Sequence, residues 1–213
     1  MPEPQPAFQF VNLRQQQDTA QLGIWAFIAT EVLFFGGLLL AYCVYRMGDP
    51  DGFAEAGRHT EIVIGTANTA VLLTSSFLVA WAVAAARLGE GRLAALLAWA
   101  AALLGLIFLA LKGVEYAAEY DEHLVPGLDF AYAGPHAVTV RLFFSLYFVA
   151  TALHGLHVMI GIIALAVIGR QAWRGHYSER YHSPIVVAGL YWHFVDVVWI
   201  VLFALIYLPG RSS

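Results

Sequence analysis

Charged residues are scarce in this sequence of 213 residues. Only 12% of them are Asp, Glu, Lys or Arg, whereas 60% are hydrophobic. Soluble domains usually carry about 25% charged residues, so the shortage argues against a soluble domain and favours an integral membrane protein. The eleven lysines and arginines form no basic run, and the sequence therefore gives no indication of a nucleic-acid partner.

Cysteine and the common catalytic motifs are also missing or nearly so. Cys43 is the single cysteine, and one thiol cannot form an internal disulfide, an iron–sulfur site or a structural zinc site. The sequence lacks a CxxCH motif, a glycine-rich phosphate loop and a nucleophile–base motif. These absences argue against covalently attached haem, nucleotide binding and hydrolytic catalysis.

Long apolar runs are what the sequence has instead. A helix that crosses a membrane needs about 20 mostly apolar residues, and five stretches meet this requirement: 22–46, 61–87, 92–115, 138–169 and 183–208. They predict an all-α fold, an integral membrane bundle of five transmembrane helices that forms one domain over residues 22–213. Residues 1–21 are rich in proline and glutamine and predict a polar N-terminal arm.

The basic residues between the spans indicate an orientation. If the N-terminus is cytoplasmic, the inner segments hold six arginines: Arg14, Arg87, Arg92, Arg170, Arg174 and Arg180. The outer side then holds five basic residues: Arg46, Arg58, Lys112, Arg141 and Arg211. Because basic residues favour the cytoplasmic side, we expect the N-terminus inside and the C-terminus outside. We expect the longest outer loop to be acidic, with Glu119, Asp121, Glu122 and Asp129.

Ionisable residues fall near the middle of the predicted spans. They are Glu31, His154, His157, His193 and Asp196. A charged side chain that faces lipid at mid-span costs about 2.5–3.5 kcal/mol or more. We therefore expect these residues to face one another or a polar cavity, in one central layer of the bundle.

Three ionisable pairs have a spacing of three residues: Lys112 with Glu115, His154 with His157, and His193 with Asp196. This spacing places both members on one helix face, and a hydrogen bond between His193 and Asp196 would fix the imidazole tautomer. Proton handling, a structural polar network, and a metal or haem site all remain open. The haem interpretation would require one b-type haem between His193 and either His154 or His157.

Five motifs resemble one family, in that family's order: TEVLFF at 30–35, NTAVLLTSSF at 68–77, KGVEY at 112–116, HGLHVMIG at 154–161 and YWHFVDVVW at 191–199. They are similar to subunit III of the haem–copper cytochrome c oxidases. The common form of that subunit has seven helices, and TEVLFF corresponds to its third helix. The resemblance therefore implies the short, five-helix bacterial form, from an oxidase of the aa3 or caa3 type.

The resemblance implies an accessory subunit in a bacterial plasma membrane. Such a subunit holds no haem, copper or other metal itself; these are expected in partner subunits. It packs on the catalytic subunit I, near the mouth of a proton-uptake channel, together with subunit II and other oxidase subunits, and it binds phospholipid. Glu31 falls on the family's buried carboxyl. The resemblance implies interhelical bonding for His154, His157, His193 and Asp196.

Other assignments stay open at this point. Related subunits occur in quinol oxidases and beside nitric oxide reductases, so the motifs do not identify the electron donor. A stand-alone proton-coupled transporter would share the buried carboxyl and histidines, although it would usually show an inverted repeat or broken helices. Whether the complex joins a respiratory supercomplex is not indicated by the sequence.

Overall fold

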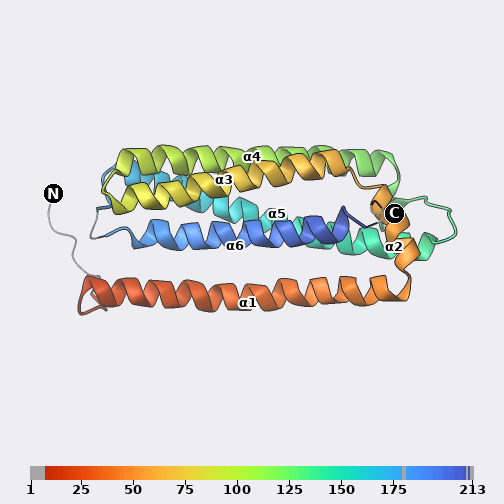
Figure 1. Ribbon diagram of the computed structural model, residues 1–213, viewed down its shortest axis with the longest axis horizontal. Helices are drawn as coiled ribbons and strands as arrows, with labels where there is room; N and C mark the ends of the chain where they lie inside the picture. The colour runs from red at the N-terminus through yellow and green to blue at the C-terminus, as the bar shows by residue number, and fades with distance from the viewer. Residues whose placement is uncertain (1–7, 179–180, 210, 212–213) are drawn as a thin grey trace.

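Long helices run side by side through the protein in a computed structural model that describes residues 8–178, 181–209 and 211 (Figure 1). The helices are α1 (Leu13–Gly48), α2 (Pro50–Arg58), α3 (Ile62–Arg87), α4 (Gly91–Asp121), α5 (Ala137–Trp173) and α6 (Ser183–Ile206). Strands β1 (Leu124–Val125) and β2 (Asp129–Phe130) form a short antiparallel hairpin after α4. Within the described residues, all the helices except α2 are long and apolar enough to cross a membrane. The predicted all-α, five-span architecture is therefore confirmed.

Helices α1, α4 and α5 extend beyond the predicted spans. Helix α1 begins at Leu13 because Asn12 caps it: the Asn12 side chain accepts a hydrogen bond of 2.8 Å from the backbone N–H of Gln15. Part of the expected N-terminal arm is thus helical, and residues 1–7 lie outside the described part. Helix α4 continues to Asp121, so Glu119 and Asp121 lie in a helix and not in the acidic loop where we expected them.

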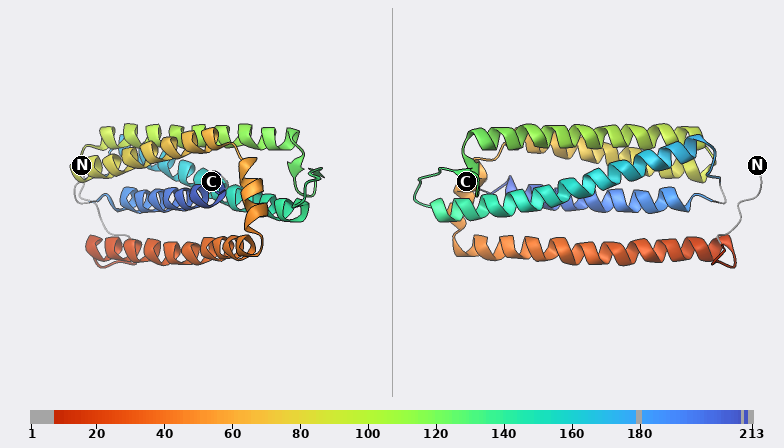
Figure 2. Two further views of the ribbon diagram at one scale, coloured as in Figure 1. Left: turned by 45° about the vertical axis from the view of Figure 1, so that its right-hand side comes forward. Right: turned by 180° about the vertical axis from the view of Figure 1, so that it is seen from behind.

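Four of the long helices form a closed ring. Helix α3 packs on α4, α4 on α5, α5 on α6, and α6 again on α3. Helix α1 runs along the outside of this ring, where it packs mainly on α6 and less on α5 (Figure 2). Only 17% of the most apolar stretch of α1 is buried, against 56% in α6. Helix α6 is therefore the central helix of the bundle, and α1 is peripheral.

The short helix α2 closes one end of the bundle, which we call the C-terminal end because the chain also finishes there (Figure 1). The Asp49 carboxylate begins α2 by accepting a hydrogen bond from the N–H of Gly52. Arg211 donates from its guanidinium to the carbonyls of Gly57 and Thr60 near the end of α2. These contacts connect the last described residue to the segment between α1 and α3.

Small residues set the distance between α4, α5 and α6. The indole of Trp192 on α6 is 1% exposed and lies between Gly105 on α4 and Gly161 on α5. A Cβ atom at Gly105 would come within 2.8 Å of this ring, and one at Gly161 within 2.7 Å. The two glycines therefore allow the helices to approach closely around a large aromatic side chain.

Candidate functional site

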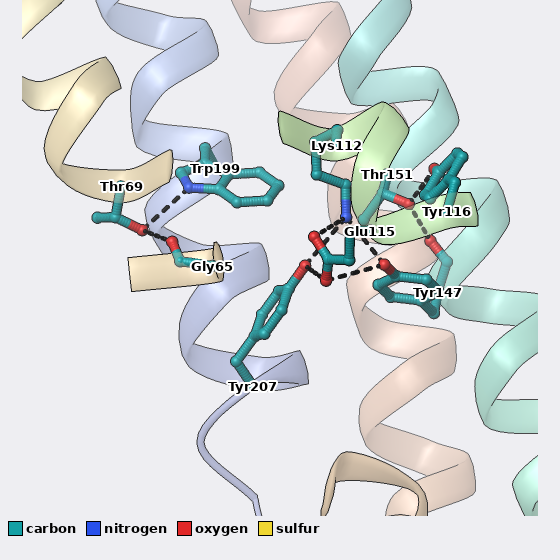
Figure 3. A network of polar contacts seen from close by, with 9 residues as sticks. All are labelled: Gly65, Thr69, Lys112, Glu115, Tyr116, Tyr147, Thr151, Trp199 and Tyr207. Carbon is teal, nitrogen blue, oxygen red and sulfur yellow. Dashed lines mark hydrogen bonds and ion pairs between the residues drawn. The ribbon is translucent and has the colours of Figure 1, made fainter. Parts of the chain in front are cut away.

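A buried ion pair forms the centre of a polar network between α4, α5 and α6 (Figure 3). Lys112 Nζ lies 2.9 Å from Glu115 Oε2, a contact that their spacing of three residues on one helix face permits. Lys112 also donates to the hydroxyls of Tyr147, at 2.9 Å, and Tyr207, at 3.0 Å. Tyr147 belongs to α5, and Tyr207 caps the C-terminus of α6. The network thus joins three helices.

Both charged groups of the pair are fully hydrogen-bonded. The Glu115 Oε1 atom accepts from the Tyr207 hydroxyl at 2.6 Å and from the Tyr147 hydroxyl at 3.2 Å. All three N–H groups of the Lys112 ammonium have acceptors, and both Glu115 oxygens have donors. A buried ion pair is stable only when such additional bonds replace the lost water. This network meets that requirement.

Aromatic rings and further hydroxyls surround the ion pair. The Lys112 ammonium lies 4.8 Å from the ring centre of Tyr147 and 5.0 Å from that of Tyr116, within the range of cation–π attraction. The Thr151 hydroxyl donates to the Tyr147 carbonyl, and it therefore accepts from the Tyr116 hydroxyl, at 2.5 Å. These tyrosines were not among the predicted site residues; the signal that indicates them is phenol groups within otherwise apolar spans.

Glu31 contacts His157 and thereby joins the peripheral α1 to α5. Glu31 Oε2 lies 3.2 Å from His157 Nε2, while His157 Nδ1 lies 2.8 Å from the Leu153 carbonyl. Because a carbonyl only accepts, His157 Nδ1 carries a proton and donates it to Leu153. Either a protonated Glu31 donates to a neutral imidazole, or an imidazolium donates to a carboxylate. The Glu31–His157 pair thus shares one proton and has no net charge in either state.

His154 takes no part in this contact, although it lies one turn away on the same helix. Its ring packs against the rings of Phe108 on α4 and Trp199 on α6, with centres 5.6 Å and 5.3 Å apart. Neither ring nitrogen has a hydrogen-bond partner among the described residues. The expected interhelical hydrogen bond of His154 is therefore wrong: its surroundings are aromatic side chains from two neighbouring helices.

His193 and Asp196 are not hydrogen-bonded to each other, although their spacing places both on one face of α6. His193 Nδ1 instead lies 2.6 Å from the Ser76 hydroxyl on α3. The Asp196 carboxyl is 3% exposed, and neither of its oxygens has a hydrogen-bond partner in the described part of the chain. The imidazole turns away from its own helix because α3 offers a hydroxyl at the same level. The predicted polar layer is consequently divided into separate clusters.

The described residues contain no group of three or more His, Cys, Asp or Glu side chains placed to hold a metal ion. Apart from Asp196, the predicted site residues instead contact aromatic rings, hydroxyls, backbone carbonyls or one another, as described above. This arrangement can hold protons and charges within the bundle and can fix helices relative to each other.

A second cluster lies at the C-terminal end of the bundle, outside the spans. The Asp49 carboxylate accepts from the Thr139 hydroxyl at 2.6 Å and from the Gly52 N–H at 3.0 Å, and its Oδ2 lies 3.0 Å from His136 Nδ1. The bonds from Thr139, then Gly52, and then the His136 contact, hold the pKa of Asp49 below its ordinary value. The cluster thus connects the α1–α2 junction to the beginning of α5.

We expect Thr139→Val to raise the pKa of Asp49 toward its ordinary value, because the strongest donor to the carboxylate is removed. A lowered pKa stabilises the folded state above the ordinary Asp pKa, and this stabilisation disappears as the pH falls through the folded-state pKa. The variant should therefore unfold at a lower temperature than wild type near neutral pH, and the difference should shrink in acid. Thermal unfolding of the purified protein as a function of pH measures this.

Thr74→Val is the matched control for Thr139→Val. The Thr74 hydroxyl bonds only to a carbonyl of its own helix, Ala70, on an exposed face. This control should keep the wild-type pH dependence. An unchanged pH profile in Thr139→Val would show that the hydroxyl does not hold the Asp49 carboxylate.

Known proteins resemble this chain along nearly its whole length. Residues 7–211 match the family described as cytochrome c oxidase subunit III. The cytochrome c oxidase subunit 3 of Thermostichus vulcanus is 34% identical over 201 residues, which cover 94% of this chain and 92% of the relative. That of a Synechocystis species is 39% identical over 194 residues, which cover 90% and 76%. That of Arabidopsis thaliana is 32% identical over 197 residues, which cover 88% and 68%.

These matches agree with five helices that can cross a membrane and with the five motifs of the sequence. They identify a multi-pass membrane protein that associates with other subunits of an oxidoreductase. The chain belongs to the cytochrome c oxidase subunit III family of the haem–copper oxidases.

Proposed function

We propose that the chain is a non-catalytic subunit of a bacterial cytochrome c oxidase of the aa3 or caa3 type, and that it supports proton uptake by the catalytic subunit I. The observation that carries this proposal is the Glu31–His157 contact. It places a carboxyl of the TEVLFF motif against an imidazole of the HGLHVMIG motif, and the two groups share one proton. Such a pair can pass its proton between carboxyl and imidazole without leaving a net charge in the membrane.

We propose the orientation and partners that the sequence implied. The N-terminus faces the cytoplasm and the C-terminus the outside of a bacterial plasma membrane. Haem and copper belong to partner subunits, among them subunits I and II. Cytochrome c is the favoured electron donor over quinol because the relatives are named cytochrome c oxidase subunit 3. A nitric oxide reductase-associated role and a stand-alone transporter are disfavoured for the same reason.

Phospholipid binding also belongs to this proposal. A pocket of about 380 Å³ lies where α1 passes α5 and α6, and its wall is almost entirely apolar. Ile24 and Phe27 from α1, Ile160 from α5, and Val187 and Tyr191 from α6 contribute to the wall. A pocket of this composition suits an acyl chain. Mass spectrometry of the intact complex would identify both the retained lipid and the partner subunits.

We expect Glu31→Gln to leave the oxidase assembled and its initial rate of oxygen reduction nearly unchanged. Glutamine keeps the shape of the carboxyl and can still bond to His157, but it cannot accept or release the shared proton. Proton supply should then fail sooner during sustained turnover. The measurement is oxygen consumption by the purified oxidase, followed from the first turnovers until activity is lost.

The variant Glu90→Gln serves as the control. It makes the same substitution at an exposed position in the connection between α3 and α4, and it should behave as wild type. Loss of assembly in Glu31→Gln would show that the carboxyl is structural. Sustained turnover equal to wild type would count against a part of Glu31 in proton uptake.

A further inference from the structure

Glu119 is a buried carboxyl that none of the contacts described so far explains. It lies on α4, one turn beyond Glu115 toward the C-terminal end of the bundle, and it is 2% exposed. Residues four apart in a helix share a face, so Glu119 is directed to the same side of α4 as the ion pair. Neither of its oxygens has a hydrogen-bond partner among the described residues.

The neighbouring ion pair offers Glu119 no free donor. The ammonium of Lys112 is already bonded to Glu115, Tyr147 and Tyr207. The Tyr147 hydroxyl also lies within hydrogen-bonding reach of Glu119, but its single proton is donated to Glu115 at 3.2 Å. The neutral Lys112–Glu115 pair is thus complete without a second carboxylate.

The charges around Glu119 are also unfavourable for a second anion. The titratable groups that act on it are Lys112 and Glu115 on α4, Glu122 directly after α4, and Tyr147 on α5. Tyr116 and Tyr207 also interact with its charge. Lys112 is the one cation in this set of described residues, and Glu115 balances it. An isolated, buried carboxylate without donors has a very high free energy, whereas the protonated acid is neutral.

We infer that Glu119 is a proton-binding site: its carboxyl holds a proton beside the closed Lys112–Glu115 pair and exchanges it at the C-terminal end of the bundle. The exposed Glu122, which follows α4 directly, is a surface acid that acts on Glu119. When Glu119 releases its proton to water there, the new carboxylate competes with Glu115 for Lys112. Proton binding at Glu119 is thereby linked to the contacts among α4, α5 and α6.

Infrared spectroscopy of the purified oxidase complex at neutral pH tests this inference. A protonated carboxylic acid has a C=O stretching band that a carboxylate lacks. We expect the difference spectrum between wild type and Glu119→Gln to contain one such band, and the band should shift when glutamate is labelled with carbon-13 in its side-chain carboxyl. The exposed Glu90→Gln, in the connection between α3 and α4, is the control and should leave the band in place.

The variant Glu31→Gln separates this inference from the proposed function. The proposed function depends on Glu31, whereas the inference about Glu119 does not. The Glu119 band should persist in Glu31→Gln, whatever happens to sustained turnover. Absence of the band in wild type would overturn the inference. Failure of Glu119→Gln to assemble would also overturn it, since glutamine is a neutral substitute of the same shape as the protonated acid.

Discussion

Replacement of Lys112 by methionine is expected to lower the free energy of unfolding by about 3–5 kcal/mol, the usual effect of removing one member of a buried ion pair. Lys112 is the single lysine of the sequence, and it is 6% exposed. Methionine fills a similar volume but donates no hydrogen bond. Glu115, which is completely buried, would keep its two tyrosine donors and lose its cation. The loss of stability is the free energy of leaving the Glu115 carboxylate buried without a compensating charge.

The double variant Lys112→Met, Glu115→Gln is the control that isolates the charge. It removes both charges and keeps an acceptor for the hydroxyls of Tyr147 and Tyr207, so we expect it to recover most of the lost stability. The measurement is unfolding of the purified complex by heat or by denaturing detergent, with all variants in the same lipid. If the double variant is as unstable as the single one, packing of the lysine side chain and not its charge stabilises this end of the bundle.

The second large effect is expected from a single methyl group. Gly105→Ala should lower the free energy of unfolding by about 1–3 kcal/mol, the usual range for overpacking in a full core. The new Cβ would lie 2.8 Å from Cη2 of Trp192 and 2.9 Å from Cγ1 of Ile162. Both neighbours are held between helices, so they can only move by separating α4 from α5 and α6.

Gly113→Ala tests the same substitution on the same helix without the clash. No atom outside the helix backbone lies within 4 Å of a Cβ built at Gly113. Alanine is favoured over glycine in a helix interior by roughly 0.5–1 kcal/mol, so this variant should be neutral or slightly stabilising. Equal stability of the two variants in the detergent-purified complex would show that Trp192 does not require the close approach of α4.

Some contacts could be predicted from the sequence because both partners lie in one helix. The contact between Lys112 and Glu115 follows from the helical repeat alone, since residues three apart share a face. The same reasoning failed for His193 and Asp196. There the spacing was right, but Ser76 on α3 offered the imidazole a better partner. A spacing of three residues therefore permits a contact and does not decide between local and distant partners.

The other members of the network could not be predicted in this way. Tyr147 and Tyr207 reach Lys112 from 35 and 95 residues away, and nothing in their own helices indicates that they meet. Glu119 was expected in a loop because it belongs to an acidic run. Its burial depends on how far α4 extends and on the hairpin β1–β2, which packs against α4 and α5 through β1.

The sequence by itself determined the five membrane-crossing helices and the family, because these depend on the length and polarity of segments and on local motifs. It also determined that several ionisable residues must lie within the membrane domain. Only the tertiary structure decided which of them meet: Glu31 with His157, Lys112 with two distant tyrosines, and Glu119 with no donor. The reason is physical, since side-chain partners in a bundle depend on the rotation and depth of each helix against its neighbours, which close packing around residues such as Trp192 determines.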